Sequence, residues 1–296
     1  MNIKYLTPLF IIVYISFGLT SCKHKSENHR TVSVSILPQK YFIERIAGDY
    51  LQINVMIPPG MNTATADLST DQLKKLYDSD LCFTIGYLPF ELTHLYPVLK
   101  NRQDIEVVNH SEGLHLLNGS CSHQYHDDHK HGSIDPHIWL SPVNARQMAT
   151  TIFQILSERY PEQQATFHTH YQALLQDIDM VAQKAQQVFS TSQERVFLIY
   201  HPALTYFAAD YGLEQISIED EGKEPNPAHL KKLIDLARKK NIHIIFIQSQ
   251  FDVDNAKSIA KEINGQIIPI DPLTEDWTGE MMKLIRVFET VEQSNY

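Results

Sequence analysis

The chain has 296 residues, of which 43% are hydrophobic and 20% charged, a globular composition long enough for about two domains. Asp and Glu outnumber Lys and Arg by 35 to 25, and the resulting net charge of −10 argues against nonspecific binding to nucleic acid, which needs a basic face. Three cysteines are too few for a disulfide framework. The unusual count is 15 histidines.

Residues 1–22 are predicted to be a targeting segment. Lys4 is its only charge, and the apolar run 5–19 that follows is short for a membrane span but typical of the core of a signal peptide. The run ends in the sequence LTSC, which is typical of a bacterial lipobox with Cys22 as the lipidated first residue after cleavage. An ordinary signal peptide or an anchor helix with an incidental Cys is the alternative. We expect a tether over 23–30 and a mature chain in the cell envelope, outside the cytoplasmic membrane, on its periplasmic or cell-surface face.

Residues 31–160 alternate short apolar runs with helical patterns, which predicts an N-terminal α/β lobe. The apolar runs predict strands at 32–37, 53–57, 81–85 and 105–108. The amphipathic stretches predict helices at 41–47, 70–77 and 91–99. Cys82 lies in the third strand and is expected to be buried, although a bridge between Cys82 and Cys121 stays open.

Residues 191–296 repeat this rhythm and predict a C-terminal α/β lobe. Strands are expected at 196–200, 215–218, 242–247 and 266–270, and helices at 203–211, 227–240, 253–263 and 276–291. Strands that alternate with helices indicate βαβ units and a largely parallel sheet. The predicted fold class is therefore α/β, with two lobes of parallel sheet.

A long helix is predicted at 161–190, between the two lobes. Its apolar residues recur in steps of four and three from Phe167 to Val188, no Gly or Pro interrupts residues 162–190, and Pro161 stands where a helix can begin. A helix of this length is a rod of roughly 40 Å. We expect it to join the lobes and to limit hinge motion between them; a long helix inside one domain is the alternative.

A histidine-rich loop is predicted at 121–132. It is polar and without periodicity, and it contains four histidines, namely His123, His126, His129 and His131. Neutral imidazole is a good zinc ligand, so the loop is a candidate auxiliary metal site. Because flexible ligands lose conformational entropy on binding, such a site would be weak and exchangeable. A merely solvated polar loop is the alternative.

A second candidate metal site combines His137, His201 and Asp271. His201 directly follows the strand at 196–200 and Asp271 follows the strand at 266–270. Ligands of open α/β sheets bind beyond the carboxyl ends of the strands, where both side chains would lie. His137 can meet them from the first lobe, and two imidazoles with one carboxylate suit Zn²⁺. Hydrogen-bonded surface residues would show the same spacing.

Ordered motifs then give a family resemblance. The sequence DPHIWLSP at 135–142 resembles the DPHxWLxP segment of the zinc and manganese solute-binding proteins of ABC importers, the TroA-like or ZnuA-like family. Residues 201–213 resemble the next metal segment of that family, 221–227 the loop that follows it, and 271–273 its last ligand position. The histidine-rich loop before the DPH motif is typical of the zinc branch. The resemblance covers roughly residues 31–293.

The resemblance implies two α/β lobes bridged by one long helix, with a metal in the cleft between them. It gives the ligand roles to His137, His201 and Asp271. Manganese-specific relatives tend to have a carboxylate where this chain has His201, and imidazole there favours zinc. The implied function is capture of Zn²⁺, the cargo, and its delivery to the membrane permease and ATPase of an importer, by a lipid-anchored monomer that is not an enzyme.

One departure from the family pattern affects the fourth ligand. The family usually has a His shortly after the second strand, and the aligned position here is Ala64, which cannot bind metal. Water, Asp67, Glu91, His94 or a loop histidine could take the fourth position.

The departure keeps two alternative functions open. One is a surface adhesin or interaction lipoprotein that has lost high-affinity metal transport. The other is a zinc hydrolase with a bound water at the open position and Glu221 or Glu224 as general base.

Overall fold

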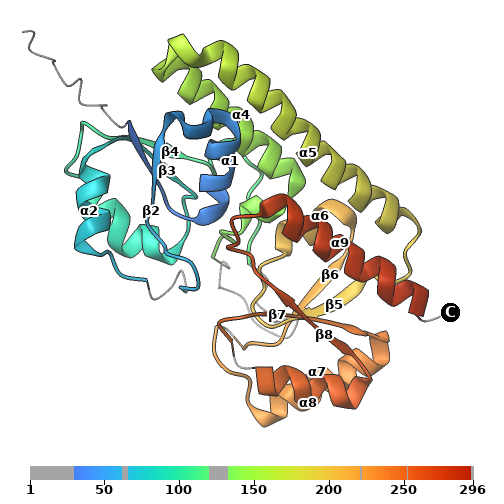
Figure 1. The fold of residues 1–296 in the computed structure, drawn as a ribbon. Helices are drawn as coiled ribbons and strands as arrows, with labels where there is room; N and C mark the ends of the chain where they lie inside the picture. Colours follow the sequence, from blue (N-terminus) through green and yellow to red (C-terminus); the bar gives the residue numbers. More distant parts are fainter. Residues whose placement is uncertain (1–29, 62–65, 120–132, 221, 252, 295–296) are drawn as a thin grey trace, which may run out of the picture.

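A computed structural model of the chain describes residues 30–61, 66–119, 133–220, 222–251 and 253–294. These residues form two lobes, each built on a parallel four-stranded sheet (Figure 1). The predicted α/β fold with two lobes is confirmed. Several expectations lie outside the described residues, namely those on Cys22, Ala64, Cys121, the loop histidines and Glu221.

The N-terminal sheet has the strand order β2-β1-β3-β4. Its strands are β1 (Thr31–Val34), β2 (Gln52–Val55), β3 (Ser79–Thr84) and β4 (Glu106–Asn109). The helices around it are α1 (Leu37–Ala47), α2 (Thr70–Tyr77) and α3 (Tyr96–Leu99), with a 3₁₀ turn at Gly48–Tyr50 and a π-helical turn at Glu91–Leu95. Cys82 lies buried in β3 with a free thiol.

The first strand is shorter and the first helix longer than the sequence predicted. The side chain of Gln39 explains the boundary, because its Oε1 accepts from the backbone N–H of Ser35 at 2.9 Å and of Ile36 at 3.2 Å. The Ser35 N–H also donates to the carbonyl oxygen of Phe83 in β3 at 3.2 Å, whereas the Ile36 N–H precedes the helix and has no partner within it. The chain therefore leaves the sheet after Val34 and enters α1 at Leu37.

The C-terminal sheet has the equivalent order β6-β5-β7-β8. Its strands are β5 (Val196–Ile199), β6 (Glu214–Ser217), β7 (Ile244–Gln248) and β8 (Gln266–Ile270). The helices are α6 (Thr205–Tyr211), α7 (Pro227–Lys240), α8 (Val253–Ile263) and α9 (Trp277–Ser294). All four strands of this sheet are parallel. Their carboxyl ends, and the residues that follow them, therefore lie at one edge of the sheet.

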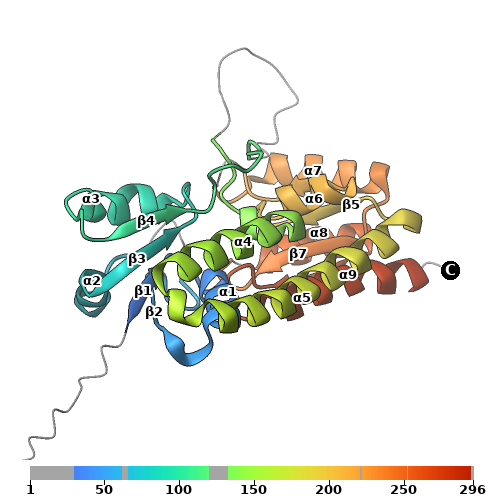
Figure 2. The ribbon, with the colours of Figure 1, turned by 90° about the horizontal axis from the view of Figure 1, so that it is seen from above.

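A helical pair connects the lobes. It consists of α4 (Pro142–Arg159) and α5 (Gln164–Thr191), with 3₁₀ turns at Ile138–Leu140 and Pro161–Gln163. Helix α5 runs along both lobes (Figure 2), and it forms ion pairs with each: Arg45 of α1 to Asp177 at 2.6 Å, and Lys184 to Glu289 of α9. The long helix is thus a rod that joins the lobes. No helix in the described part of the chain is both long and apolar enough to cross a membrane.

Two buried tryptophans tie the lobes together beside this rod. The indole Nε1 of Trp139 donates to the carbonyl oxygen of Pro272 at 2.8 Å, and the Nε1 of Trp277 donates to the carbonyl oxygen of Trp139 at 2.7 Å. Phe42 of α1 packs against Trp277 with ring centroids 5.3 Å apart. The junction between the lobes is therefore packed and hydrogen-bonded rather than a loose linker.

Candidate metal site

A cavity of about 490 Å³ lies between the two lobes, and we call it the interlobe cavity. Its N-terminal wall follows β3 and consists of Tyr87, Pro89, Leu92 and Thr93. The segment that enters the helical pair adds Ser133, Ile134, Pro136, His137 and Trp139. The C-terminal lobe contributes the carboxyl edge of its sheet, including His201, Glu219, Gln248, Phe251, Pro272 and Leu273.

His137 is a largely buried imidazole fixed by the carboxylate of Asp135. The carboxylate Oδ1 accepts from the His137 ring Nδ1 at 2.7 Å and from the His137 backbone N–H at 2.8 Å. Burial alone would raise the pKa of Asp135, but its electrostatic attraction to His137 and the hydrogen bonds it accepts outweigh burial and hold that pKa below its usual range. Asp135 is therefore ionised and keeps the proton of His137 on Nδ1.

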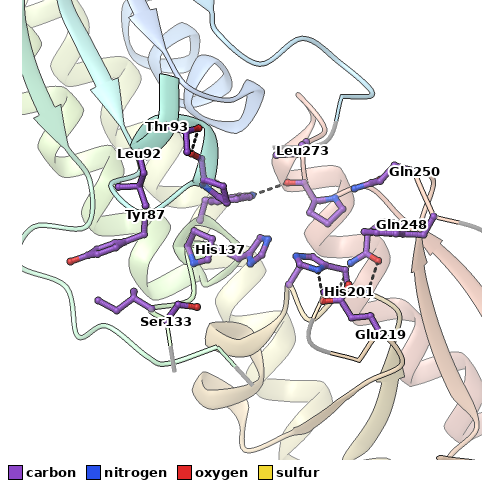
Figure 3. A pocket seen from close by; sticks show the side chains of 18 residues that line it. Tyr87, Leu92, Thr93, Ser133, His137, His201, Glu219, Gln248, Gln250 and Leu273 are labelled. Carbon is purple, nitrogen blue, oxygen red and sulfur yellow. Dashed lines mark hydrogen bonds and ion pairs between the residues drawn. The ribbon is translucent and has the colours of Figure 1, made fainter. Parts of the chain in front are cut away.

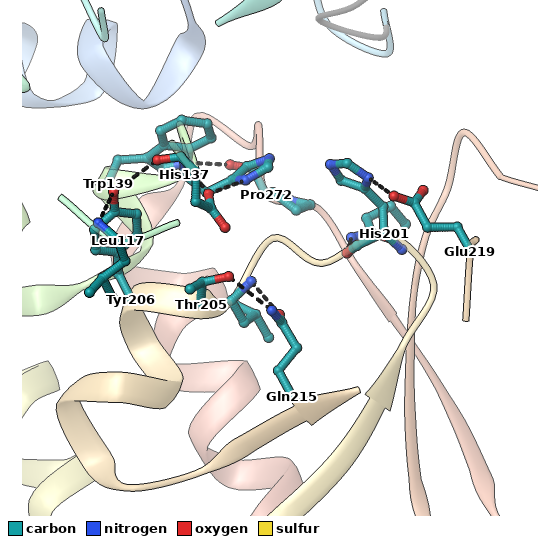
Figure 4. A network of polar contacts seen from close by, with 12 residues as sticks. Leu117, His137, Trp139, His201, Thr205, Tyr206, Gln215, Glu219 and Pro272 are labelled. Carbon is teal, nitrogen blue, oxygen red and sulfur yellow. Dashed lines mark hydrogen bonds and ion pairs between the residues drawn. The ribbon is translucent and has the colours of Figure 1, made fainter. Parts of the chain in front are cut away.

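His201 is held in the same manner from the other side. Its Nδ1 donates to Glu219 Oε1 at 2.9 Å, and its ring stacks on Phe251. The side chain of Gln248 fixes its backbone, accepting from the N–H of His201 at 3.2 Å and donating to its carbonyl at 2.7 Å. Both the ring and the peptide of His201 are thus set by residues of the C-terminal sheet edge, and Figure 4 shows the contact between the ring and Glu219.

The two imidazoles point toward each other across the cavity (Figure 3). Their centroids are 5.2 Å apart and their planes meet at 69°. Because each Nδ1 is hydrogen-bonded to a carboxylate, each Nε2 is left with its lone pair for a metal. The spacing fits one zinc ion between the two rings, since Zn–N bonds are about 2.0–2.1 Å.

The segment that carries His137 is attached to the C-terminal lobe. The hydroxyl of Tyr206 in α6 donates to the carbonyl oxygen of Asp135 at 2.8 Å and accepts from the N–H of Leu117 at 3.2 Å. The Trp139 bond to Pro272 fixes the other end of the segment. Both histidines are therefore tied to the C-terminal lobe.

Asp271 lies at the same sheet edge but does not line the cavity. It is exposed, and its Oδ1 accepts from the N–H of Leu273 at 3.0 Å. Within the described ranges, no three His, Cys, Asp or Glu side chains gather closely enough to hold a metal ion. The structure thus brings together His137 and His201, and the ligand role of Asp271 stays a prediction.

The candidates for the fourth ligand lie elsewhere. Glu91 is buried, and its carboxylate accepts from the backbone N–H groups of Ile85 and Gly86, both at 2.6 Å, and from Ser35 Oγ. Burial raises the pKa of Glu91. These bonds give Glu91 a structural role and do not support its interpretation as a ligand.

His94 and Asp67 form an exposed pair, with Nε2 and Oδ1 3.7 Å apart, and neither lines the cavity. Their ligand roles stay predictions.

Glu219 and Gln248 are the site residues that sequence reasoning missed. The predicted acids in this region were Glu221 and Glu224; Glu224 is exposed and is not among the residues lining the cavity. A signal was available, because Glu219 comes two residues after the end of β6, at the sheet edge that carries His201.

Comparison with known proteins places the chain in a family. Residues 32–291 match the family described as the periplasmic component A of zinc-uptake complexes. The crystal structure of ZnuA has a TM-score of 0.79 and 31% identity and covers 88% of this chain and 98% of ZnuA. A zinc-bound deletion mutant of ZnuA has a TM-score of 0.79 and 30% identity, with 89% and 98% covered.

A curated relative is similar over most of this chain. The zinc-binding lipoprotein AdcA of Streptococcus pneumoniae is 25% identical over 285 residues, which is 92% of this chain and 56% of AdcA. The chain thus spans little more than half of that relative. These matches confirm the resemblance to the zinc branch, the expected cargo and the expected role in zinc import. The chain belongs to the family of the periplasmic component A of zinc-uptake complexes, the zinc-binding solute components of metal ABC importers.

Proposed function

We propose that this chain captures Zn²⁺ outside the cytoplasmic membrane with His137 and His201 and delivers it to the permease and ATPase of an importer. The observation that carries this assignment is the pair of imidazoles, 5.2 Å apart and each backed by a carboxylate. A carboxylate behind a ligating histidine fixes its tautomer and raises its basicity. Nitrogen donors favour zinc over the harder Mn²⁺.

Asp271 is the third ligand in this proposal. It follows β8 at the edge that carries His201, and its neighbours Pro272 and Leu273 already line the cavity. Exchange of its contact with the Leu273 N–H for the metal would complete a set of two histidines and one carboxylate. Water, Asp67, His94 or a loop histidine would take the fourth position.

The rest of the chain serves this capture in the cell envelope. Cys22 would carry the lipid anchor, residues 23–30 the tether, and His123, His126, His129 and His131 a weak collecting site. AdcA is itself named a lipoprotein, which supports the anchor. The family is one of solute-binding proteins, so we assign the chain no catalytic step and propose that it acts as a monomer.

A competition titration with a zinc-chelating dye tests the proposal. The wild-type chain should bind one tight equivalent, and His201→Ala should weaken it about 100-fold or more, beyond the usual effect of an outer-shell residue. His168→Ala is the matched control, because His168 is an exposed histidine of α5, outside the cavity. It should change the affinity less than about twofold. If the wild-type chain shows only weak sites and these survive in His201→Ala, the loop at 121–132 is the sole binder of zinc. That result would overturn the proposal.

A further inference from the structure

A short antiparallel ladder leads into the candidate metal site. Residues 117–119 pair with residues 133–135, and two backbone hydrogen bonds, both of 2.9 Å, hold the pair together. One of these bonds runs from the N–H of Asp135 to the carbonyl oxygen of Leu117. His137 follows Asp135 after a single proline. The end of this ladder therefore determines where the main chain brings His137 to the cavity.

The last pair of the ladder is held open by a side chain. In a regular antiparallel pair, opposite residues exchange two hydrogen bonds, so the N–H of Leu117 would also donate to the carbonyl oxygen of Asp135. The hydroxyl of Tyr206 stands between these two groups instead (Figure 4). It accepts from the N–H of Leu117 at 3.2 Å and donates to the carbonyl oxygen of Asp135 at 2.8 Å. An inserted hydroxyl keeps the donor and the acceptor farther apart than a direct bond of about 2.9 Å would.

Asp135 transmits this position to the metal ligand. Its carbonyl oxygen is held by Tyr206, and its carboxylate holds the ring and the backbone N–H of His137. Tyr206 is 2% exposed and Asp135 is 3% exposed, so water has little access to these bonds. Burial raises the pKa of Tyr206, which keeps its hydroxyl protonated and able to donate.

Tyr206 also belongs to the segment that carries the other histidine. It is the second residue of α6, five residues after His201. The side chain of Gln215 fixes the start of α6 with hydrogen bonds of 2.7 and 3.0 Å. Both imidazoles thus take their positions from residues 201–206, His201 directly and His137 through the Tyr206 hydroxyl.

From this arrangement we infer that Tyr206 is a positioning residue that sets the spacing between His137 and His201 for zinc. Without the hydroxyl, the N–H of Leu117 can bond directly to the carbonyl oxygen of Asp135. Asp135 then moves toward Leu117 and takes His137 with it. Because zinc–nitrogen distances vary by only about 0.2 Å, such a shift weakens a site that uses both rings. The inference rests on the proposed function, which assigns zinc to these two histidines.

The variant Tyr206→Phe removes the hydroxyl alone and tests the inference. Dye competition should show a zinc affinity about tenfold or more below that of the wild type, as for other residues behind a metal ligand. The absorption bands of Co²⁺ bound in place of zinc should shift, because they depend on the arrangement of the ligands. A merely structural role would lower the stability and leave both the affinity and the Co²⁺ spectrum unchanged, and that result would overturn the inference.

Tyr171→Phe is the matched control. The Tyr171 hydroxyl also makes a hydrogen bond, with Thr150 at 2.9 Å, but it joins α5 to α4 outside the cavity. This variant should change the zinc affinity less than about twofold and leave the Co²⁺ spectrum unchanged. The denaturant midpoint of metal-free Tyr206→Phe should fall no further than that of Tyr171→Phe, because closure of the ladder pairs both freed backbone groups.

Crystal structures of the metal-free wild type and Tyr206→Phe measure the spacing directly. The variant should have a direct bond of about 2.9 Å between the Leu117 nitrogen and the Asp135 oxygen. The distance between the rings of His137 and His201 should differ from that of the wild type, and an unchanged distance would overturn the inference. This comparison needs no zinc, so it tests the inference even if the proposed function fails. Tight binding that depends on His201 but not on Tyr206 defeats only the inference.

Discussion

The two lobes place a glutamate at equivalent edges of their sheets but use it differently. In the N-terminal lobe, Glu91 turns inward and accepts from the N–H groups of Ile85 and Gly86. In the C-terminal lobe, Glu219 accepts from the ring of His201 at the cavity surface. Glu91 follows β3 and Glu219 follows β6, so the same residue type beyond the carboxyl ends of the strands stabilises a loop in one lobe and orients a metal ligand in the other. Fold position alone does not decide which role a carboxylate takes; its hydrogen-bond donors do.

This comparison teaches that the metal chemistry is concentrated in one lobe. The described C-terminal edge provides His201 and its partners and also anchors the segment of His137 through Tyr206. The described N-terminal edge provides one wall of the interlobe cavity. We therefore expect variants at the N-terminal edge to change the stability of the protein, and variants at the C-terminal edge to change its affinity for zinc.

The largest effect is expected for Glu91→Ala. The substitution leaves three buried N–H groups, those of Ile85, Gly86 and Leu88, without their acceptor, and each such loss costs roughly 1–3 kcal/mol. The free energy of unfolding should fall by about 3 kcal/mol or more in total, measured by denaturant titration with circular dichroism. The exposed Glu112→Ala is the control and should change it by less than about 0.5 kcal/mol. Equal stability of the two variants would show that Glu91 is not a structural residue.

A pH dependence should also arise in the N-terminal lobe, from His110. Burial lowers the pKa of His110 from 6.5 to about 3, and its Nδ1 is hydrogen-bonded to Gln39 Nε2. The unfolded chain therefore binds the proton first, so the stabilising contribution is complete above pH 6.5 and is lost as the pH falls from 6.5 toward 3. Each pH unit should cost up to about 1.4 kcal/mol.

The variant His110→Gln, which retains an acceptor for Gln39, isolates this dependence. Unfolding titrations at several pH values below 6.5 should show a shallower fall in the free energy of unfolding for the variant than for the wild type. Parallel curves for the two proteins would contradict the assignment to His110.

In the C-terminal lobe, Glu219→Ala should weaken zinc binding with little effect on stability. Loss of the partner of His201 Nδ1 should reduce the affinity by about 10–100-fold, as is usual for outer-shell residues. Glu219→Gln retains an acceptor and should lose less. Dye competition measures all three proteins, with the exposed Glu224→Ala as control. If Glu219→Ala leaves the zinc affinity unchanged, His201 is not a zinc ligand held by Glu219.

The smallest effect is expected at the ion pair that links α1 to the segment before α9. Lys40 Nζ lies 2.6 Å from Glu275 Oε1, but the two side chains are 24% and 48% exposed. A double-mutant cycle of Lys40→Ala and Glu275→Ala should give a coupling of about 0.2–1 kcal/mol. A coupling above about 2 kcal/mol would mean that this pair, rather than the buried tryptophans, holds the lobes together.

The fold was predictable from the sequence where the signals are local. Helix α7 begins at the predicted residue because Asn226 caps it and Pro227 follows, and it ends at Asn241, whose φ of 55° is left-handed. The start of α1 was not predictable, because Gln39 bonds to residues that read as a continuing strand. The role of Glu91 depends on Ser35, 56 residues away, and no local pattern shows such a partner.

Part of the candidate site was also predictable from the sequence. The pairing of His137 with His201 follows from their positions at strand and segment ends, and the structure places the two rings 5.2 Å apart. The roles of Tyr206 and Trp139 depend on hydrogen bonds between distant segments, so composition and spacing indicated only packing.

The paired indoles at the junction have an optical consequence. Trp139 and Trp277 are the two tryptophans of the whole chain, and both are buried at one place. The ring of His137 lies 5.3 Å from that of Trp139. The intrinsic tryptophan fluorescence of the protein therefore originates beside the metal site and at the contact between the lobes, so the chain carries its own label-free reporter of zinc arrival and of any change in the junction.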